Sequence, residues 1–174
     1  MSYTEMFGFD KKGDAYFLAE IKNSWRGGIA IWNFLYDKYY GGTFPMFSGQ
    51  AGFDQLNDAF ERMPEYEQIA LQTTYDYALI KRENFQQVID AFRAFEGETS
   101  LKEQANVIES ALADEDCIAI GWNQTSVNGD NWTNYGGYDE KNDEAIPYNI
   151  NKDDKHWFLS GFASEAKPSE DGTA

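Results

Sequence analysis

Residues 84–122 read NFQQVIDAFRAFEGETSLKEQANVIESALADEDCIAIGW, and this stretch holds the most regular hydrophobic pattern in the chain. In its first third, large apolar residues recur at steps of three and four, as on one face of a helix. Asn84 can cap this helix and Gly97 can end it. The pattern predicts a helix over 85–95 with an apolar stripe formed by Phe85, Val88, Ile89, Phe92 and Phe95.

A second helix is predicted directly after the first. Ser100 and Glu103 have the spacing of a capping box, in which each side chain bonds with the backbone at the start of the helix. The short connection predicts that the two helices pack as a hairpin. Residues 117–122, CIAIGW, are uniformly apolar and predict a central strand. The apolar face of the second helix consists of Leu101, Ala105, Ile108 and Leu112.

The N-terminal part of the chain predicts a β-hairpin followed by a helix. Two apolar runs flank a polar turn at 10–14, so residues 6–21 predict the hairpin. Asn23 or Ser24 can cap the next helix, in which aromatic and aliphatic residues recur at helical spacing. Gly41 and the glycine after it would end this helix.

The intervening segments complete the predicted fold. Residues 53–63 predict a short helix that ends before a proline. Residues 67–83 alternate in hydrophobicity and predict two short strands or one bent strand, and residues 156–162 predict a last strand. The order of elements predicts an α+β fold.

This fold is expected to be a single compact domain over residues 1–164, with a small, mainly antiparallel sheet, the N-terminal β-hairpin and about four helices. A long irregular C-terminal loop region follows the central strand. The polar residues 165–174 predict a disordered acidic tail.

The formal net charge of −16 restricts the kinds of partner. Acidic and basic residues balance over residues 1–43, whereas residues 101–174 hold 15 acidic residues against 5 basic ones. Such a surface repels nucleic-acid phosphates and anionic lipids and attracts basic proteins. We therefore expect a basic protein partner, no direct contact with nucleic acid and no membrane association. A single cysteine and a start without a secretory pattern predict a cytoplasmic protein.

The sequence contains no recognisable catalytic or metal-binding motif. The one Cys and the one His, Cys117 and His156, are too few for a structural zinc site. Asn149, Asn151 and Asp153 alternate as in a calcium loop, but the positions that require Gly and Glu are occupied by other residues. We expect no metal, no cofactor and no enzymatic activity.

The long loop over residues 123–155 contains the candidate binding site. Its aromatic residues lie beside clustered acids, a combination that suits a basic partner, since charge directs the encounter and aromatic side chains provide binding energy. Exposed aromatics would support recognition, whereas buried ones would make this segment a cover over the core. The predicted partner-binding residues are Trp132, Tyr135, Tyr138, Asp139, Glu140, Asp143, Glu144, Asp153 and Asp154.

In size, in charge and in the helical pair FQQVIDAFRAFEGETSLKEQANVIESAL, the chain resembles small acidic proteins of phages and mobile elements of Gram-positive bacteria. Many such proteins inhibit restriction or CRISPR nucleases or imitate DNA, so the resemblance implies a counter-defence protein that acts on a nucleic-acid-binding enzyme. Imitation of DNA requires the acids to gather on one face, since 16 charges match only about 27 Å of duplex.

Two other functions are compatible with the sequence. The first is a small-ligand or carbohydrate-binding protein, with or without hydrolytic activity, that uses Trp122, Trp132, Tyr135 and nearby carboxylates. The second is a structural or assembly component of a phage. In that case aromatic residues would be buried by self-association, and the chain would form a homo-oligomer.

Overall fold

A five-stranded sheet forms the centre of the molecule, and its strands lie in the order β2-β1-β4-β3-β7. The structure is a computed structural model that describes residues 2–48, 50–124, 132 and 137–162. Neighbouring strands are antiparallel except for β3 and β7, which are parallel. The strands are β1 (Tyr3–Phe9), β2 (Ala15–Lys22), β3 (Ala78–Lys81), β4 (Ala119–Asn123) and β7 (Trp157–Phe158).

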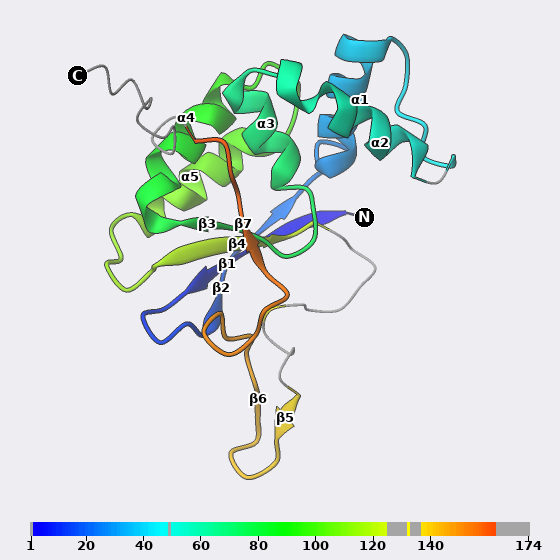
Figure 1. Cartoon of the computed structure of the whole chain (residues 1–174). Coiled ribbons are helices and arrows are strands. Elements are labelled where there is room, and N and C mark those ends of the chain that lie inside the picture. The colour runs from blue at the N-terminus through cyan, green and yellow to red at the C-terminus, as the bar shows by residue number, and fades with distance from the viewer. Residues whose placement is uncertain (1, 49, 125–131, 133–136, 163–174) are drawn as a thin grey trace, which may run out of the picture.

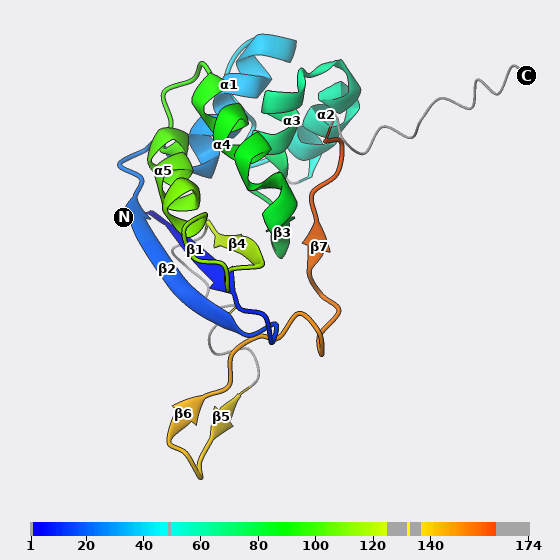
Figure 2. The same ribbon diagram turned by 90° about the vertical axis from the view of Figure 1, so that its left-hand side faces the viewer.

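Helices cover one face of this sheet (Figure 1), and α4 packs against both α3 and α5. The view in Figure 2 shows the helices above the sheet and a small separate hairpin below it. Among the described residues, no helix is long and apolar enough to cross a membrane. The helices are α1 (Gly28–Tyr40), α2 (Ala51–Ala59), α3 (Glu65–Gln72), α4 (Phe85–Ala94) and α5 (Leu101–Ala111), with 3-10 turns η1 (Phe60–Arg62) and η2 (Arg82–Asn84).

Strand β4 separates two hydrophobic clusters because successive side chains of a strand point to opposite faces. Ile120 and Trp122 belong to the large cluster between the sheet and the helices. Ala119 belongs to a smaller cluster on the opposite face, and Gly121 faces the same way, toward Phe9 and Leu79. All five residues of β4 are buried, and the strand contributes side chains to both clusters.

The smaller cluster is completed by residues that follow β4 in the chain. The indole of Trp132 is fully buried and makes edge-to-face contacts with Phe9 and Tyr148, at 5.3 and 5.0 Å between ring centroids. It lies over Gly121, where a Cβ atom would be 3.3 Å from Trp132 Cζ2. The bare backbone of Gly121 thus makes room for the indole.

The α+β class and its main elements are confirmed. The predicted hairpin forms as β1 and β2, and the predicted pair of helices forms as α4 and α5. The apolar run 117–122 contains β4, which lies between β1 and β3. The predicted last strand is present as the short β7. The predicted tail over 165–174 lies outside the described residues.

The prediction of strands throughout residues 67–83 is wrong, because α3 occupies the first part of this segment. The apparent alternation of Ile69 and Leu71 arises in a helix that is buried on several sides, where Ala70 and Gln72 are buried as well. Pro64 at the N-cap of α3 and two glutamates in its first turn are helix-start signals. Only β3 forms a strand here.

The predicted side-chain caps are also wrong. Ser100 Oγ donates to Asn23 Oδ1 at 3.1 Å, and Glu103 pairs with Arg26 at 2.9 Å, so neither side chain caps α5. These groups instead link the helix to the segment after β2. Asn84 likewise makes no capping bond with α4.

The first helix starts later than predicted, at Gly28 rather than near Asn23 or Ser24. Ser24 and Trp25 adopt positive φ angles of 47° and 70°, a conformation that is unfavourable for residues with a side chain. These two residues therefore form a tight turn between β2 and α1, and the Trp25 side chain is 94% exposed.

A buried carboxylate fastens α1 to α3. Glu67 is fully buried, and it accepts hydrogen bonds from Lys38 Nζ and, at 2.6 Å, from the Tyr39 hydroxyl. The hydrogen bond with Glu67 raises the pKa of Lys38, and the ammonium therefore stays charged beside the carboxylate. A buried charge requires such partners, since an unpaired one would be costly.

We predict that a side chain added at position 121 destabilises the fold, because the space above Gly121 is already occupied by neighbouring side chains. A Cβ atom at this position would lie 2.4 Å from Leu79 Cδ2, so Gly121→Ala should destabilise the protein, and Gly121→Val should do so by about 1–3 kcal/mol. Urea unfolding would measure the difference. Combining Gly121→Ala with Leu79→Ala should cost less than the sum of the single changes. Strict additivity would contradict the packing described here.

Candidate functional site

The candidate site is a short acidic hairpin, here called the arm, that comprises residues 137–146. Its strands β5 (Tyr138–Asp139) and β6 (Glu144–Ala145) pair with each other and with no other described strand. The Ile146 N–H donates to the Gly137 carbonyl at 2.9 Å and closes the base of the hairpin. In Figures 1 and 2 the arm projects from the body beyond the turn that joins β1 and β2.

The carboxylates of the arm order its turn. Asp139 accepts hydrogen bonds from the Lys141 backbone N–H at 3.0 Å and from the Asn142 side chain at 2.7 Å. These bonds, that from Asn142 above all, lower the pKa of Asp139. Asp143 has a positive φ of 56°, which Asp tolerates better than most residues. Asp139 is therefore ionised at neutral pH and holds the turn in place.

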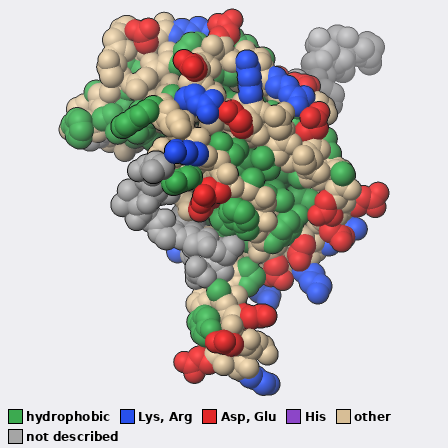
Figure 3. Space-filling view, turned by 180° about the vertical axis from the view of Figure 1, so that it is seen from behind, with side chains coloured by type: hydrophobic (Ala, Val, Ile, Leu, Met, Phe, Trp, Pro, Cys, Tyr) green, Lys and Arg blue, Asp and Glu red, His purple; other side chains and the backbone are tan. Residues whose placement is uncertain are grey.

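The Asp143 carboxylate also orients an aromatic ring. It accepts a hydrogen bond from the Tyr138 hydroxyl, and this bond raises the pKa of Tyr138. The ring remains 57% exposed, and Ile146 beside the base of the arm is 41% exposed. Figure 3 shows carboxylates around apolar side chains on the arm. The arrangement presents apolar surface beside negatively charged side chains.

The base of the arm is anchored to the smaller hydrophobic cluster on both sides. Trp132, which precedes the arm, donates from Nε1 to the Trp122 carbonyl at 2.9 Å. Tyr148, which follows it, is fully buried and donates its backbone N–H to the Trp132 carbonyl. Trp132 is thus a core residue that supports the arm, and it presents no surface to a partner. Tyr135 lies outside the described residues.

Asp153 and Asp154 lie in a different loop from the arm. Asp153 Oδ2 accepts the Asn149 backbone N–H at 3.2 Å, so this carboxylate has a local structural role. The Asn149 and Asn151 side chains both donate to the Lys12 carbonyl, at 3.0 and 2.9 Å. Asn149 and Asn151 therefore attach this loop to the β1–β2 turn. The Asp154 side chain is exposed.

The described residues offer no cluster of three or more His, Cys, Asp or Glu side chains that could hold a metal ion. Burial raises the pKa of the Cys117 thiol, which therefore stays protonated at neutral pH. The thiol donates to the Ala119 carbonyl at 3.5 Å. Trp122 is also buried and donates to Gln104 Oε1 at 2.9 Å. Neither Trp122 nor Trp132 has a ring face available for stacking on a sugar.

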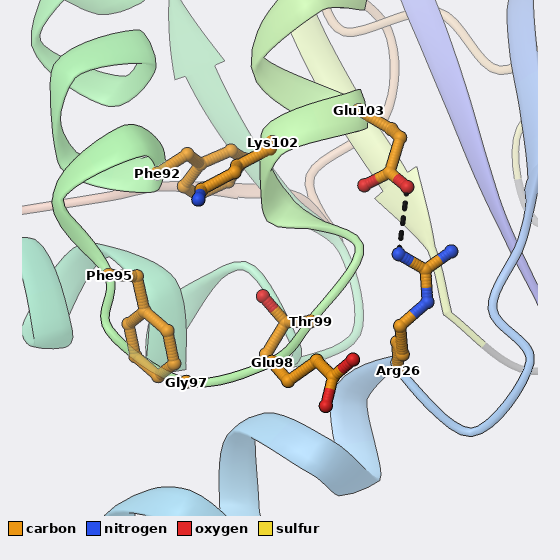
Figure 4. A pocket seen from close by; sticks show the side chains of 8 residues that line it. All are labelled: Arg26, Phe92, Phe95, Gly97, Glu98, Thr99, Lys102 and Glu103. Carbon is orange, nitrogen blue, oxygen red and sulfur yellow. Dashed lines mark hydrogen bonds and ion pairs between the residues drawn. The ribbon is translucent and has the colours of Figure 1, made fainter.

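A small hollow of about 260 Å³ lies between the end of α4 and the start of α5. Figure 4 shows Arg26 and Lys102 at this hollow, together with Glu98 and Glu103. The Arg26 guanidinium is paired with Glu103, and the side chains combine two positive with two negative charges. The hollow therefore lacks the positive surplus that an anion site requires.

Comparisons with protein-family models, with curated proteins and with solved structures found no match. The function must therefore be argued from the surfaces of the molecule.

Sequence reasoning located the acids of the arm but missed its structure. The turn residues Lys141 and Asn142 between two short acidic segments are a hairpin signal, because Asn and Asp favour tight turns. The anchoring role of Tyr148 was missed, since no periodic pattern surrounds it. Ile146, the second exposed apolar residue of the arm, was also missed.

We predict that acidification lowers the stability of the fold through His156, which contacts Tyr148 after the arm. Its Nδ1 lies 2.8 Å from the Tyr148 hydroxyl, and burial lowers its pKa below 6.5, although Asp153 and Asp154 act in the opposite direction. The folded state thus binds a proton less readily than the unfolded chain. The stabilisation that neutral His156 contributes to the folded state is complete above about pH 6.5, and it is lost as the pH falls toward the lower pKa of the folded state.

The measurement is the free energy of unfolding in urea between about pH 7.5 and pH 5.5. It should decrease more in the wild type than in His156→Gln, which does not titrate in this range. The matched variant accounts for the carboxylates, whose protonation affects both proteins. Equal pH dependence in the two proteins would show that His156 contributes nothing.

Proposed function

We propose that the protein is a non-enzymatic binding module whose arm docks on a basic protein surface. The observation that carries this proposal is the exposed Tyr138 ring, which is hydrogen-bonded to Asp143 on a hairpin that contains four carboxylates. The carboxylates are Asp139, Glu140, Asp143 and Glu144.

The electrostatics of the arm favour a cationic partner. The arm contains four acidic side chains and one lysine, Lys141, within a chain of net charge −16. Long-range attraction would speed the encounter with a basic surface and make it sensitive to salt.

The apolar part of the arm would supply binding energy. Tyr138 is oriented by Asp143, so its ring loses little conformational freedom on binding. Tyrosine is among the residues that most often dominate interface energetics, and Arg-rich surfaces interact favourably with aromatic rings. Ile146 extends the apolar area at the base.

The resemblance to acidic proteins of phages and mobile elements indicates which partners to test first. A counter-defence protein would act on a nucleic-acid-binding enzyme, whose DNA-binding cleft is basic. The arm would enter such a cleft as a negatively charged, narrow projection. Restriction and CRISPR nucleases are the enzymes of this kind that the resemblance implies.

We expect neutralisation of the arm to abolish salt-sensitive binding. The variant Asp139→Asn, Glu140→Gln, Asp143→Asn, Glu144→Gln keeps the polar groups of the turn and removes its charge. A matched control neutralises four exposed acids of the helical layer and its connections: Asp54, Asp58, Glu61 and Glu83. Tyr138→Ala should weaken binding by about 1–2 kcal/mol.

The probes are a purified type II restriction endonuclease and a Cas9-type nuclease, assayed for binding and for DNA cleavage at low and high salt. A lysate pull-down with identification of captured proteins extends the search. Wild type and the control variant should bind alike, and the arm variant should bind at least about tenfold less tightly. Equal capture by the arm variant and the control would refute the proposed role of the arm.

A further inference from the structure

Strand β2 forms an open edge of the sheet on the side away from β7. It is eight residues long and pairs only with β1 in the order of the sheet (Figure 2). Among the described residues, no backbone hydrogen bond other than those with β1 involves Tyr16 to Lys22. The exposed N–H and C=O groups of such an edge are able to pair with another strand.

The backbone groups that point outward can be assigned from both ends of β2. The Ala15 N–H donates away from β1, to the Tyr148 carbonyl, whereas the Asn23 N–H donates to Ser2, on the β1 side. Along an antiparallel strand, the backbone N–H and C=O groups of successive residues point alternately toward the neighbouring strand and away from it. The backbone groups of Phe17, Glu20 and Lys22 therefore point away from β1. The register of β1 and β2 shifts between Met6 and Phe7, and this irregularity explains why the alternation changes from odd to even residues between Phe17 and Glu20.

Two opposite charges stand on this outward edge without a partner of opposite sign. Among the described residues, neither Glu20 nor Lys22 makes an ion pair. Glu20 lies directly opposite Glu5 of β1, and like charges in this position are unfavourable. A cation brought to the other side of Glu20 would relieve this repulsion.

We propose that β2 pairs with β2 of a second copy of this chain, antiparallel and with Ile21 on the two-fold axis. In this register the outward groups of Glu20 face those of the partner's Lys22, and those of Lys22 face the partner's Glu20. Two cross-strand ion pairs form at once, as in an isologous interface. Registers centred on Glu20 or Lys22 would instead oppose like charges.

The same register brings exposed aromatic residues together. Phe17 is 54% exposed near the start of β2, and Trp25 is 94% exposed shortly after its end. Antiparallel pairing about Ile21 directs the chain that follows β2 toward the partner's Phe17, because residues 17 and 25 lie four positions on either side of residue 21. The dimer would therefore bury apolar surface that the single chain leaves exposed to solvent.

The surroundings of β2 favour a second copy over a basic partner. Residues 1–43, which include β2, hold equal numbers of acidic and basic residues, so the strand itself has no surplus negative charge that would select a cationic protein. A mainly apolar hollow of about 340 Å³ lies beside the edge, and its lining includes Leu18, Val107 and one acidic residue, Asp114. Figure 3 shows apolar side chains gathered on this face.

Charge reversal tests the register directly. Glu20→Lys and Lys22→Glu should each place like charges opposite one another and weaken the dimer about tenfold. An equimolar mixture of these two variants should form a heterodimer, because opposite charges then face each other. The double variant Glu20→Lys, Lys22→Glu should restore the homodimer. Sedimentation equilibrium over the full accessible concentration range would measure all four, since the short overlap predicts a weak association.

A backbone test complements the charge test. Glu20→Pro removes the outward N–H but leaves the ladder with β1, whereas Glu20→Gln removes only the charge. The proline variant should be monomeric and should unfold at nearly the same temperature as Glu20→Gln. A monomeric wild type at every concentration would overturn the proposal. A dimer that both single reversals and the proline leave unchanged would show that another surface mediates it.

Discussion

The missing side chain of Gly121 is the constraint on which the rest of the structure depends. Gly121 lies in the middle of the central strand, on the face opposite the helices (Figure 1), and Leu79, Phe9 and Trp132 crowd the space where its Cβ would be. A Cβ atom at Gly121 would lie 2.4 Å from Leu79 Cδ2 and 3.3 Å from Trp132 Cζ2, so the bare backbone lets both side chains approach this part of the sheet closely. Gly121 thus leaves room for a second hydrophobic cluster on the face of the sheet opposite the helices.

The residues of this second cluster also hold the base of the arm. Trp132 and Tyr148 are in edge-to-face contact, and the backbone N–H of Tyr148 bonds with the carbonyl of Trp132. Residues 137–146, which lie between them in the sequence, project from the body of the molecule (Figure 1). The arm is therefore held by two buried aromatic residues, although its own strands are only two residues long.

The elements with local patterns could be predicted from the sequence. Helices α4 and α5 have one apolar face each, and β1 and β2 flank a short polar turn, so periodicity alone identifies them. Helix α3 could not be identified in this way, because Ile69, Ala70 and Leu71 are all buried and its periodicity is hidden. Ser100 was mistaken for a cap, since its bond with Asn23 is a tertiary contact that no local pattern reveals.

The candidate site could be predicted only in part, for a similar reason. The acids at 139–144 are visible as composition, and the turn residues between them indicate a hairpin. Trp132 and Tyr138 look alike in the sequence, as aromatic residues in a polar loop, yet one is fully buried and the other exposed. The difference depends on whether the ring meets a space in the sheet, and Gly121, which provides that space, lies 11 residues before Trp132.

The double anchorage of the arm separates the residues that maintain the fold from those that contact the surroundings. Loops mounted on a rigid scaffold can change in length and composition at little cost to the scaffold. The residues from 137 to 146 could accordingly diverge rapidly, or be exchanged for a different hairpin, while Trp132, Tyr148 and the sheet beneath them stay the same. The stability of the sheet therefore places little restriction on the sequence of the arm.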